Sequence, residues 1–142
     1  MPTEPITRTA VQLDLSSRIL ITTTVVASPA AAAETIIAQT APVGNLTVVS
    51  GVDLTGWAAY TVGTSGTAVR FRIRQTDVVG TVKADTGALT GSQHGAAILT
   101  ADDVEGFDAA PAVGQVYVLT MQVTAGSAAS TVSAVKLRAV VI

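Results

Sequence analysis

Three arginines at alternate positions carry the strongest chemical pattern in this chain. Arg70, Arg72 and Arg74 alternate with apolar residues over positions 69–74, so a strand here would have one apolar and one cationic face. Neighbouring arginines on that face would lie about 7 Å apart, and they would repel by about 2.4 kcal/mol at an effective dielectric near 20. They must therefore face water, meet acids on a neighbouring strand or subunit, or bind an anionic partner.

The charge balance of the chain limits what this ladder can bind. A solvated face with cross-strand ion pairs is the first interpretation, and a contact with another subunit or protein is the second. Nucleic acid is a weaker candidate, because the net charge is −2 and no aromatic residues are interleaved for base stacking. The candidates for a protein contact are these arginines and four residues near the start of the chain: Pro2, Thr3, Pro5 and Ile6.

Four acids close together suggest a second kind of site. Asp102, Asp103, Glu105 and Asp108 fall in a stretch, residues 101–114, that we expect to be an acidic loop. Their spacing does not match a calcium-binding loop, which places acids at alternate positions around a glycine. We expect a solvated loop or a counter-charge for the arginines of a neighbouring copy, and a cation site is the weaker alternative.

The remaining polar residues do not predict an enzyme. His94 is the single histidine, and no nucleophile or orienting carboxylate stands at a spacing that would make it a catalytic base. The glycines of 63–66 are not a phosphate loop, because no lysine follows and no helix begins there. Residues 45–47 fit a glycosylation sequon, but the start of the chain does not resemble a secretory signal. We therefore predict no catalytic residue, cofactor or metal.

Aromatic residues are too few for a carbohydrate platform. They make up 4% of the chain, with Trp57 as the single tryptophan. A lone tryptophan in a strand is usually part of the core, and we expect Trp57 to be buried.

The composition is that of one strand-rich domain covered by other protein. The chain has 142 residues, the size of a single domain, and no cysteine. Hydrophobic residues reach 49%, whereas charged residues reach 13%, about half the usual share. Few charges remain to protect strand edges, so we expect other copies or partners to cover much of the surface. The apolar stretch 19–37 is interrupted by polar residues and predicts no membrane span.

The order of elements follows from period-two patterns and turn residues. Residues 1–9 predict an extended N-terminal arm, and residues 10–142 a β-sandwich domain. Residues 54–76 predict a hairpin folded about the turn 63–66, and a helical turn or a loop is expected over 28–34. The other expected strands are 11–15, 19–27, 34–39, 46–50, 78–83, 95–100, 115–124 and 131–142, the last internal to a sheet. The fold class is all-β, an antiparallel β-sandwich of jelly-roll type with an extended N-terminal arm.

The Pro/Thr-rich arm and the cysteine-free strands, rich in Ala, Val, Thr and Gly, resemble the small auxiliary proteins of tailed-phage virions. The capsid decoration, or cement, proteins are the most similar in character. The resemblance spans the whole chain, and no residue motif carries it. It implies β-rich subunits that form homotrimers on the capsid exterior, with arms that reach across capsomer joints. The heads of phage fibres and the tumour-necrosis-factor and C1q-like ligands are similar as well, although the missing signal sequence and stalk count against the ligands.

The resemblance implies a non-enzymatic virion structural protein that decorates and stabilises a phage capsid through multivalent protein-protein contacts. Its partners would be its own copies, as a homotrimer, and the major capsid protein, with no nucleic acid and no membrane. It would be assembled in the host cytoplasm and lie on the capsid exterior. The alternative is a receptor- or glycan-binding head domain of a phage fibre or spike. A small β-sandwich hydrolase that uses His94 is the third hypothesis.

Overall fold

The computed structural model describes residues 19–22, 33–43, 51–63, 67–90, 99–123 and 130–142. The predicted arm, the predicted strands at 11–15 and 46–50 and most of the possible helical turn at 28–34 lie outside these residues. Within them every regular element is a strand, and there is no helix. The all-β prediction is therefore confirmed.

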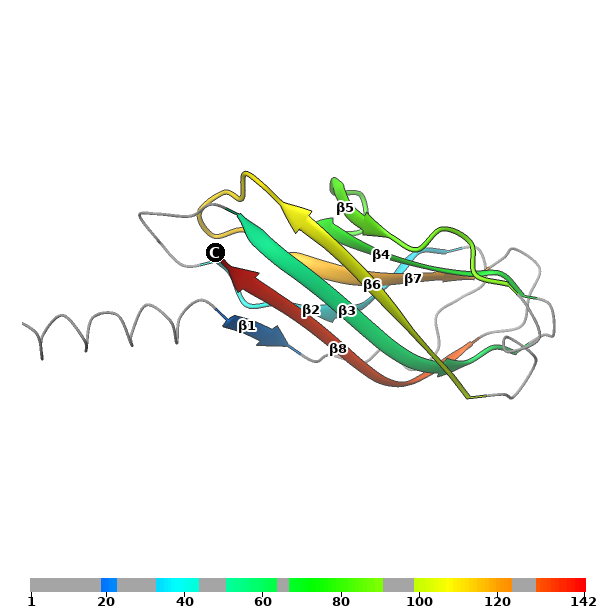
Figure 1. The fold of residues 1–142 in the computed structure, drawn as a ribbon. Helices are drawn as coiled ribbons and strands as arrows, with labels where there is room; N and C mark the ends of the chain where they lie inside the picture. The colour runs from blue at the N-terminus through cyan, green and yellow to red at the C-terminus, as the bar shows by residue number, and fades with distance from the viewer. Residues whose placement is uncertain (1–18, 23–32, 44–50, 64–66, 91–98, 124–129) are drawn as a thin grey trace, which may run out of the picture.

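The strands form two antiparallel sheets packed face to face (Figure 1). Sheet A has the order β1-β8-β3-β6, and sheet B has the order β2-β7-β4-β5. The strands are β1 (Ile19–Thr22), β2 (Thr35–Gln39), β3 (Val52–Thr61), β4 (Val69–Gln75), β5 (Val82–Asp85), β6 (Thr100–Asp108), β7 (Tyr117–Val123) and β8 (Thr131–Val141).

The pairing is nested, which gives the jelly-roll topology. β4 pairs with β5, β3 with β6, β2 with β7, and β1 with β8, as if one long hairpin had been rolled up. Two further pairings, β3 with β8 and β4 with β7, join these ribbons into the two sheets. The arrangement is the two-sheet, eight-stranded jelly roll. β8 lies between β1 and β3, so the prediction that the last strand is internal is confirmed.

The hairpin predicted over residues 54–76 is wrong. Its two strands exist as β3 and β4, but β3 belongs to sheet A and β4 to sheet B, so the chain crosses between the sheets at this point. The hairpin partner of β4 is β5, and the turn between them includes Thr76 in the left-handed conformation, with φ 69°. The short strand expected at 78–83 is accordingly displaced to Val82–Asp85.

The acidic loop expected over residues 101–114 is wrong for its first part. Residues 101–108 belong to β6, which pairs with β3 along its whole length. Side chains therefore alternate between the two sides of sheet A, and the acids do not converge. Asp103 and Glu105 point outward and are exposed, while Asp108 is buried. Of the strand expected at 95–100, only Thr100 is a described strand residue.

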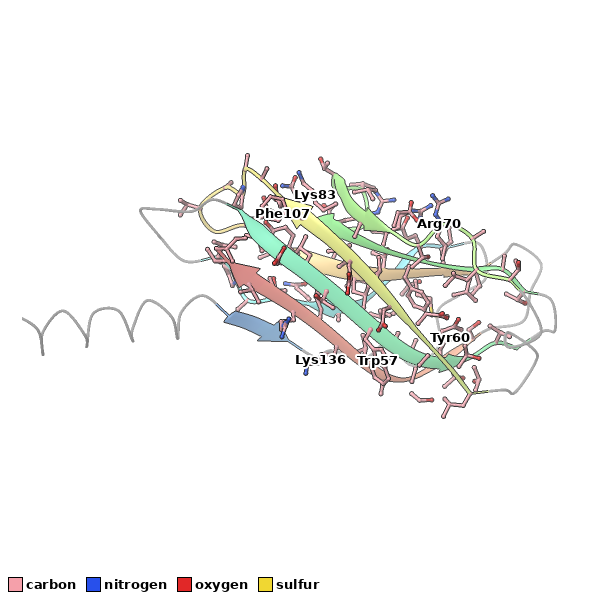
Figure 2. The ribbon with its side chains drawn as sticks, in the orientation of Figure 1. Trp57, Tyr60, Arg70, Lys83, Phe107 and Lys136 are labelled. Atoms are coloured by element: carbon pink, nitrogen blue, oxygen red, sulfur yellow. The ribbon has the colours of Figure 1, made fainter. Side chains whose placement is uncertain are left out.

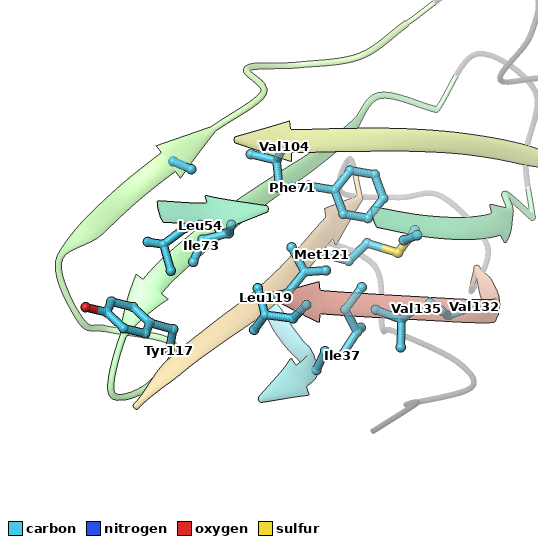
Figure 3. Packing of buried hydrophobic residues seen from close by; sticks show 14 of the residues in the cluster. Ile37, Leu54, Phe71, Ile73, Val104, Tyr117, Leu119, Met121, Val132 and Val135 are labelled. Atoms are coloured by element: carbon cyan, nitrogen blue, oxygen red, sulfur yellow. The ribbon is translucent and has the colours of Figure 1, made fainter. Parts of the chain in front are cut away.

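The core fills the space between the two sheets (Figure 3). Inward residues of β4 and β7 meet those of β3 and β8, as the period-two patterns of these strands predict. The rings of Tyr60 and Phe71 lie 5.2 Å apart, tilted by 59°, and join the sheets directly. The largest fully buried side chains are Tyr60, Tyr117, Phe71, Ile37, Leu54, Ile73, Leu119, Met121 and Leu137.

One side of the sandwich closes where β6 passes β5. A Cβ atom at Gly106 would lie 2.3 Å from the carbonyl oxygen of Lys83 and 2.6 Å from the side chain of Ala84. Only glycine allows the two backbones to approach this closely. The contact brings the last residues of β6 within reach of sheet B.

Candidate functional site

The outward side of sheet B is a network of ion pairs, which we call the arginine face. It comprises Arg70, Arg72, Arg74, Glu34, Asp85 and Thr120. Arg74 holds Glu34 in a two-pronged pair, with Nε donating to Oε1 at 2.7 Å and Nη2 donating to Oε2 at 2.9 Å. Arg70 holds Asp85 in the same way, and Nε donates to Oδ1 at 2.7 Å. Paired donors of this kind give the strongest arginine–carboxylate contacts.

Arg72 joins the two pairs. Its Nη1 donates to Oε2 of Glu34 at 2.9 Å, and its Nε donates to Oδ2 of Asp85 at 3.2 Å. The repulsion expected along the ladder is therefore offset by two carboxylates of the same chain, Asp85 on the adjacent strand β5 and Glu34 just before β2, which β7 separates from β4. Of the alternatives that the sequence leaves open, the structure shows the arginines paired with acids of the same chain. The contact of these arginines with a partner stays a prediction.

Glu34 is the most constrained carboxylate of the arginine face. Its side chain is 13% exposed and accepts hydrogen bonds from Arg72, Arg74 and the Thr120 hydroxyl, the last at 2.6 Å. Burial alone would raise the pKa of Glu34, but the hydrogen bonds from Arg74 and Thr120 and the charges of both arginines outweigh it and lower the pKa. For Asp85, the hydrogen bond from Arg70 is the main cause that lowers the pKa to about 2.

Replacing Glu34 by glutamine should lower the free energy of unfolding by roughly 1–3 kcal/mol, because the largely covered Arg74 loses its counter-charge and Arg72 keeps only Asp85. Urea unfolding followed by circular dichroism measures the change. Arg70→Gln is the matched control, since the side chain of Arg70 is 41% exposed and should lose less. A Glu34→Gln variant as stable as the wild type, or less affected than Arg70→Gln, contradicts this account.

A buried carboxylate ties the two sheets together at the end of β6. Asp108 is 0% exposed, and its Oδ2 accepts hydrogen bonds from Tyr117 at 2.8 Å and from Gln75 at 2.7 Å. Its Oδ1 lies 3.1 Å from Nζ of Lys83 and accepts from the backbone N–H of Ala110. Burial alone would raise the pKa of Asp108, but these donors outweigh it and lower the pKa. Burial and the bond to Asp108 raise the pKa of Tyr117. The cluster is structural.

The outward side of sheet A is different, and we call the part of it that β8, β3 and β6 form the tryptophan face; β1 lies beside it, next to β8. Its side chains come from β8, β3 and β6 and lie in four rows across the strands. In the order β8, β3, β6, the rows are Ala134, Ala59 and Ala101; Lys136, Trp57 and Asp103; Arg138, Thr55 and Glu105; Val140, Asp53 and Phe107. Trp57 is 37% exposed, so the prediction that it is a core residue is wrong. Figure 2 shows Trp57 and Lys136 near each other on this sheet and Arg70 on the other.

The charges of the tryptophan face are sorted by strand. Lys136 and Arg138 form a cationic column on β8, and Asp103 and Glu105 form an acidic column on β6, with Trp57 between the two. Among the residues that the structure describes, these four charged side chains make no hydrogen bond or ion pair. The arginine face, by contrast, is satisfied within the chain. The tryptophan face is therefore the better candidate for contact with another molecule.

A shallow hollow lies on the cationic half of this face. It has a volume of about 250 Å³ and is lined by Thr55, Gly56, Trp57, Lys136 and Arg138. Indole and aliphatic stems supply apolar contact there, while the two cations supply polar contact. The hollow can accept an aromatic or acidic side chain, or a sugar ring stacked on Trp57.

The other candidate residues fall into two groups. Pro2, Thr3, Pro5, Ile6, His94 and the sequon at 45–47 lie outside the described residues. The acids of β6 are separated by the strand: Asp102 accepts a hydrogen bond from the hydroxyl of Tyr60, and Asp108 lies in its own cluster. In the described ranges no three histidine, cysteine or acidic side chains gather where they could hold a metal ion.

Sequence reasoning missed the tryptophan face and the Asp108 cluster for different reasons. The outward residues of β8 do follow a period of two, and Lys136 and Arg138 were visible in that pattern. Their acidic counterparts were hidden because β6 carries acids on both of its sides: Asp102 and Asp108 point inward, and Asp103 and Glu105 point outward. Nothing in the local sequence marks Asp108 as buried.

The described residues include no helix that is long and apolar enough to cross a membrane. No known protein-family model matches the chain, and no curated protein matches it in sequence. One solved structure with a similar arrangement of strands is Eiger TNF from S. frugiperda. It is 8% identical, the match covers 87% of this chain and 91% of that one, and the TM-score is 0.48.

Proposed function

We propose that this chain is a non-enzymatic structural protein of a phage virion, which decorates the capsid exterior and stabilises it through multivalent protein contacts. Its partners in this proposal are its own copies, as a homotrimer, and the major capsid protein. Many weak contacts held on one lattice gain strength through their high effective concentration.

The observation that carries the proposal is the tryptophan face. An exposed sheet face with Trp57, Phe107 and five charged side chains that have no partner among the described residues belongs to a chain in which only 13% of residues are charged. Exposed aromatic residues beside arginine are typical of protein interfaces. The virion setting rests on the resemblance of the composition and of the Pro/Thr-rich arm to capsid decoration proteins.

Binding to isolated capsids tests the proposal. The full chain and a variant without residues 1–9 are each titrated onto capsids, and bound copies are counted after sedimentation. We expect saturable binding of the full chain and at least tenfold weaker binding without the arm, because each copy then loses one of its linked contacts. A full chain that does not bind, or an arm that makes no difference, contradicts the proposal.

A second candidate function is a glycan- or receptor-binding head of a phage fibre or spike. The observation that favours it is the hollow beside Trp57, where an exposed ring adjoins Lys136 and Arg138. A glycan array tests it. Saturable binding that Trp57→Ala abolishes, with the circular dichroism spectrum unchanged, supports this function. An empty array with the wild-type chain opposes it.

A further inference from the structure

We infer that the tryptophan face pairs with the same face of a second copy of this chain. The two copies are related by a two-fold axis that lies between the faces and runs along β3, past Trp57. This pairing goes beyond the virion role proposed above and does not depend on it.

The register of the strands makes the face complementary to itself. Lys136 and Asp103 lie in one row, on either side of Trp57, and Arg138 and Glu105 lie in the next row. A half-turn about an axis along β3 exchanges the β8 and β6 sides and leaves the rows in place. Each cation of one copy then stands over the acid of its own row in the other copy. Lys136, Arg138, Asp103 and Glu105 of each copy then all gain a partner of opposite sign.

Other face-to-face arrangements oppose like charges. A half-turn about an axis across the strands would place β8 over β8 and β6 over β6. Lys136 and Arg138 would then face each other, as would Asp103 and Glu105, and like charges across an interface strongly disfavour association. The axis along β3 is therefore the two-fold that the charge pattern selects.

The apolar residues fit the same arrangement. Trp57 lies at the axis and meets its own equivalent, where two indole rings can stack with an offset. Phe107, which is 45% exposed, comes to lie over Val140 of the second copy. The row of three alanines gives a flat margin on the other side of Trp57.

One residue opposes the pairing. Asp53 lies on β3 in the row of Phe107, so the axis brings it near its own equivalent. Removal of this charge should tighten the pairing. If the two Asp53 carboxylates lie about 10 Å apart in a largely aqueous setting, loss of their repulsion raises the association constant about twofold. Asp53→Asn is thus a variant whose effect has the opposite sign to that of the others.

The size of the face sets the strength of the pairing. Three strands about 4.8 Å apart and four rows about 7 Å apart cover roughly 400 Å². A stable interface buries about 800 Å² on each partner. The pair should therefore be weak, dependent on concentration and sensitive to salt, because most of its charges stay near solvent.

Charge-swap variants test the pairing. One variant carries Lys136→Glu and Arg138→Glu, which makes both columns acidic, and the other carries Asp103→Lys and Glu105→Lys, which makes both columns basic. Each variant should remain a monomer in low salt, even at ten times the concentration at which half of the wild-type chains are paired. An equimolar mixture of the two should pair again, because every opposed column is then complementary. A chain with all four substitutions keeps the net charge of −2 and should pair as the wild type does.

Sedimentation and light scattering give the assembly mass, and the fluorescence of Trp57, the single tryptophan, reports whether the face is covered. Circular dichroism confirms that each variant is folded. The expected wild-type assemblies are two copies, or six if trimers pair, and both dissociate in high salt. The inference is overturned if the wild type stays single up to about 1 mM in low salt, if it forms only trimers, or if the mixture of variants does not pair. Capsid binding is a separate measurement, so either proposal can fail while the other stands.

Discussion

Replacing Asp108 by alanine is expected to lower the free energy of unfolding by about 3–5 kcal/mol, because two covered donors each lose an acceptor, at about 1–3 kcal/mol per group, and a cavity remains. The carboxylate is fully buried and holds Tyr117 and Gln75 of sheet B, together with Lys83 of β5. Its loss leaves these donors without an acceptor and opens space between the sheets. Since stable domains have only about 5–15 kcal/mol to lose, this is the most damaging single substitution we foresee.

Two further variants separate the charge from the shape. Asp108→Asn keeps the volume and one acceptor oxygen, so it should cost less than alanine, roughly 1–3 kcal/mol. Asp103→Ala changes an exposed acid of the same strand and should stay within about 0.5 kcal/mol of the wild type. Urea unfolding monitored by circular dichroism gives all three values. If Asp108→Ala proved no worse than Asp103→Ala, the cluster would not hold the sheets together.

Acid should destabilise the protein over a defined range of pH. The pKa values of Glu34 and Asp108 are lowered in the folded state, and that of Asp85 is lowered to about 2. A carboxylate with a lowered pKa binds its proton less readily when folded, so it adds stability above its unfolded pKa and loses it as the pH falls. Stability should therefore be level above about pH 5 and decrease from about pH 4.5 towards pH 2. The combined loss is on the order of 3 kcal/mol.

Urea unfolding at several pH values between 7 and 2 measures this profile. The double variant Glu34→Gln, Asp85→Asn should be less stable at neutral pH and should lose less stability on acidification, because two of the three carboxylates named above no longer titrate. A wild-type profile that is flat down to pH 2, or a double variant with an unchanged slope, would count against the ion pairs of the arginine face as a source of stability.

The sequence predicts those parts of the fold in which a single strand carries its own pattern. β4 and β8 alternate apolar with charged residues, so their inward and outward sides could be assigned in advance. The all-β class and the jelly-roll type follow from the many short strands. The pairing of β3 does not, because a turn such as 63–66 can close a hairpin or carry the chain to the opposite sheet. That choice is decided by β8, which lies far away in the sequence.

Part of the candidate site could not be predicted from local sequence patterns, because it also depends on strands that are distant in the sequence. The arginine ladder could be predicted, but its counter-charges Glu34 and Asp85 come from segments on either side of β4. The exposure of Trp57 depends on β8 and β6, which flank it in the sheet. Asp108 resembled a loop acid, and only the approach of β6 to β5 at Gly106 explains its burial. Composition alone cannot supply such long-range contacts.

The nested pairing has a consequence for how the chain reaches its native state. The facing residues grow farther apart in sequence from the inner pair to the outer pair: Arg72 with Asp85, Gly56 with Val104, Ile36 with Thr120, and Ile21 with Arg138. Only β4 and β5, the innermost pair, join residues that are close in the sequence. Each pair farther out must bring its two strands together across a longer stretch of chain, which costs more conformational entropy. Folding should therefore take milliseconds to seconds, as in other sandwiches with distant pairings. During that time open edges in a chain so poor in charge can associate wrongly, so dilution during refolding should raise the yield of native protein.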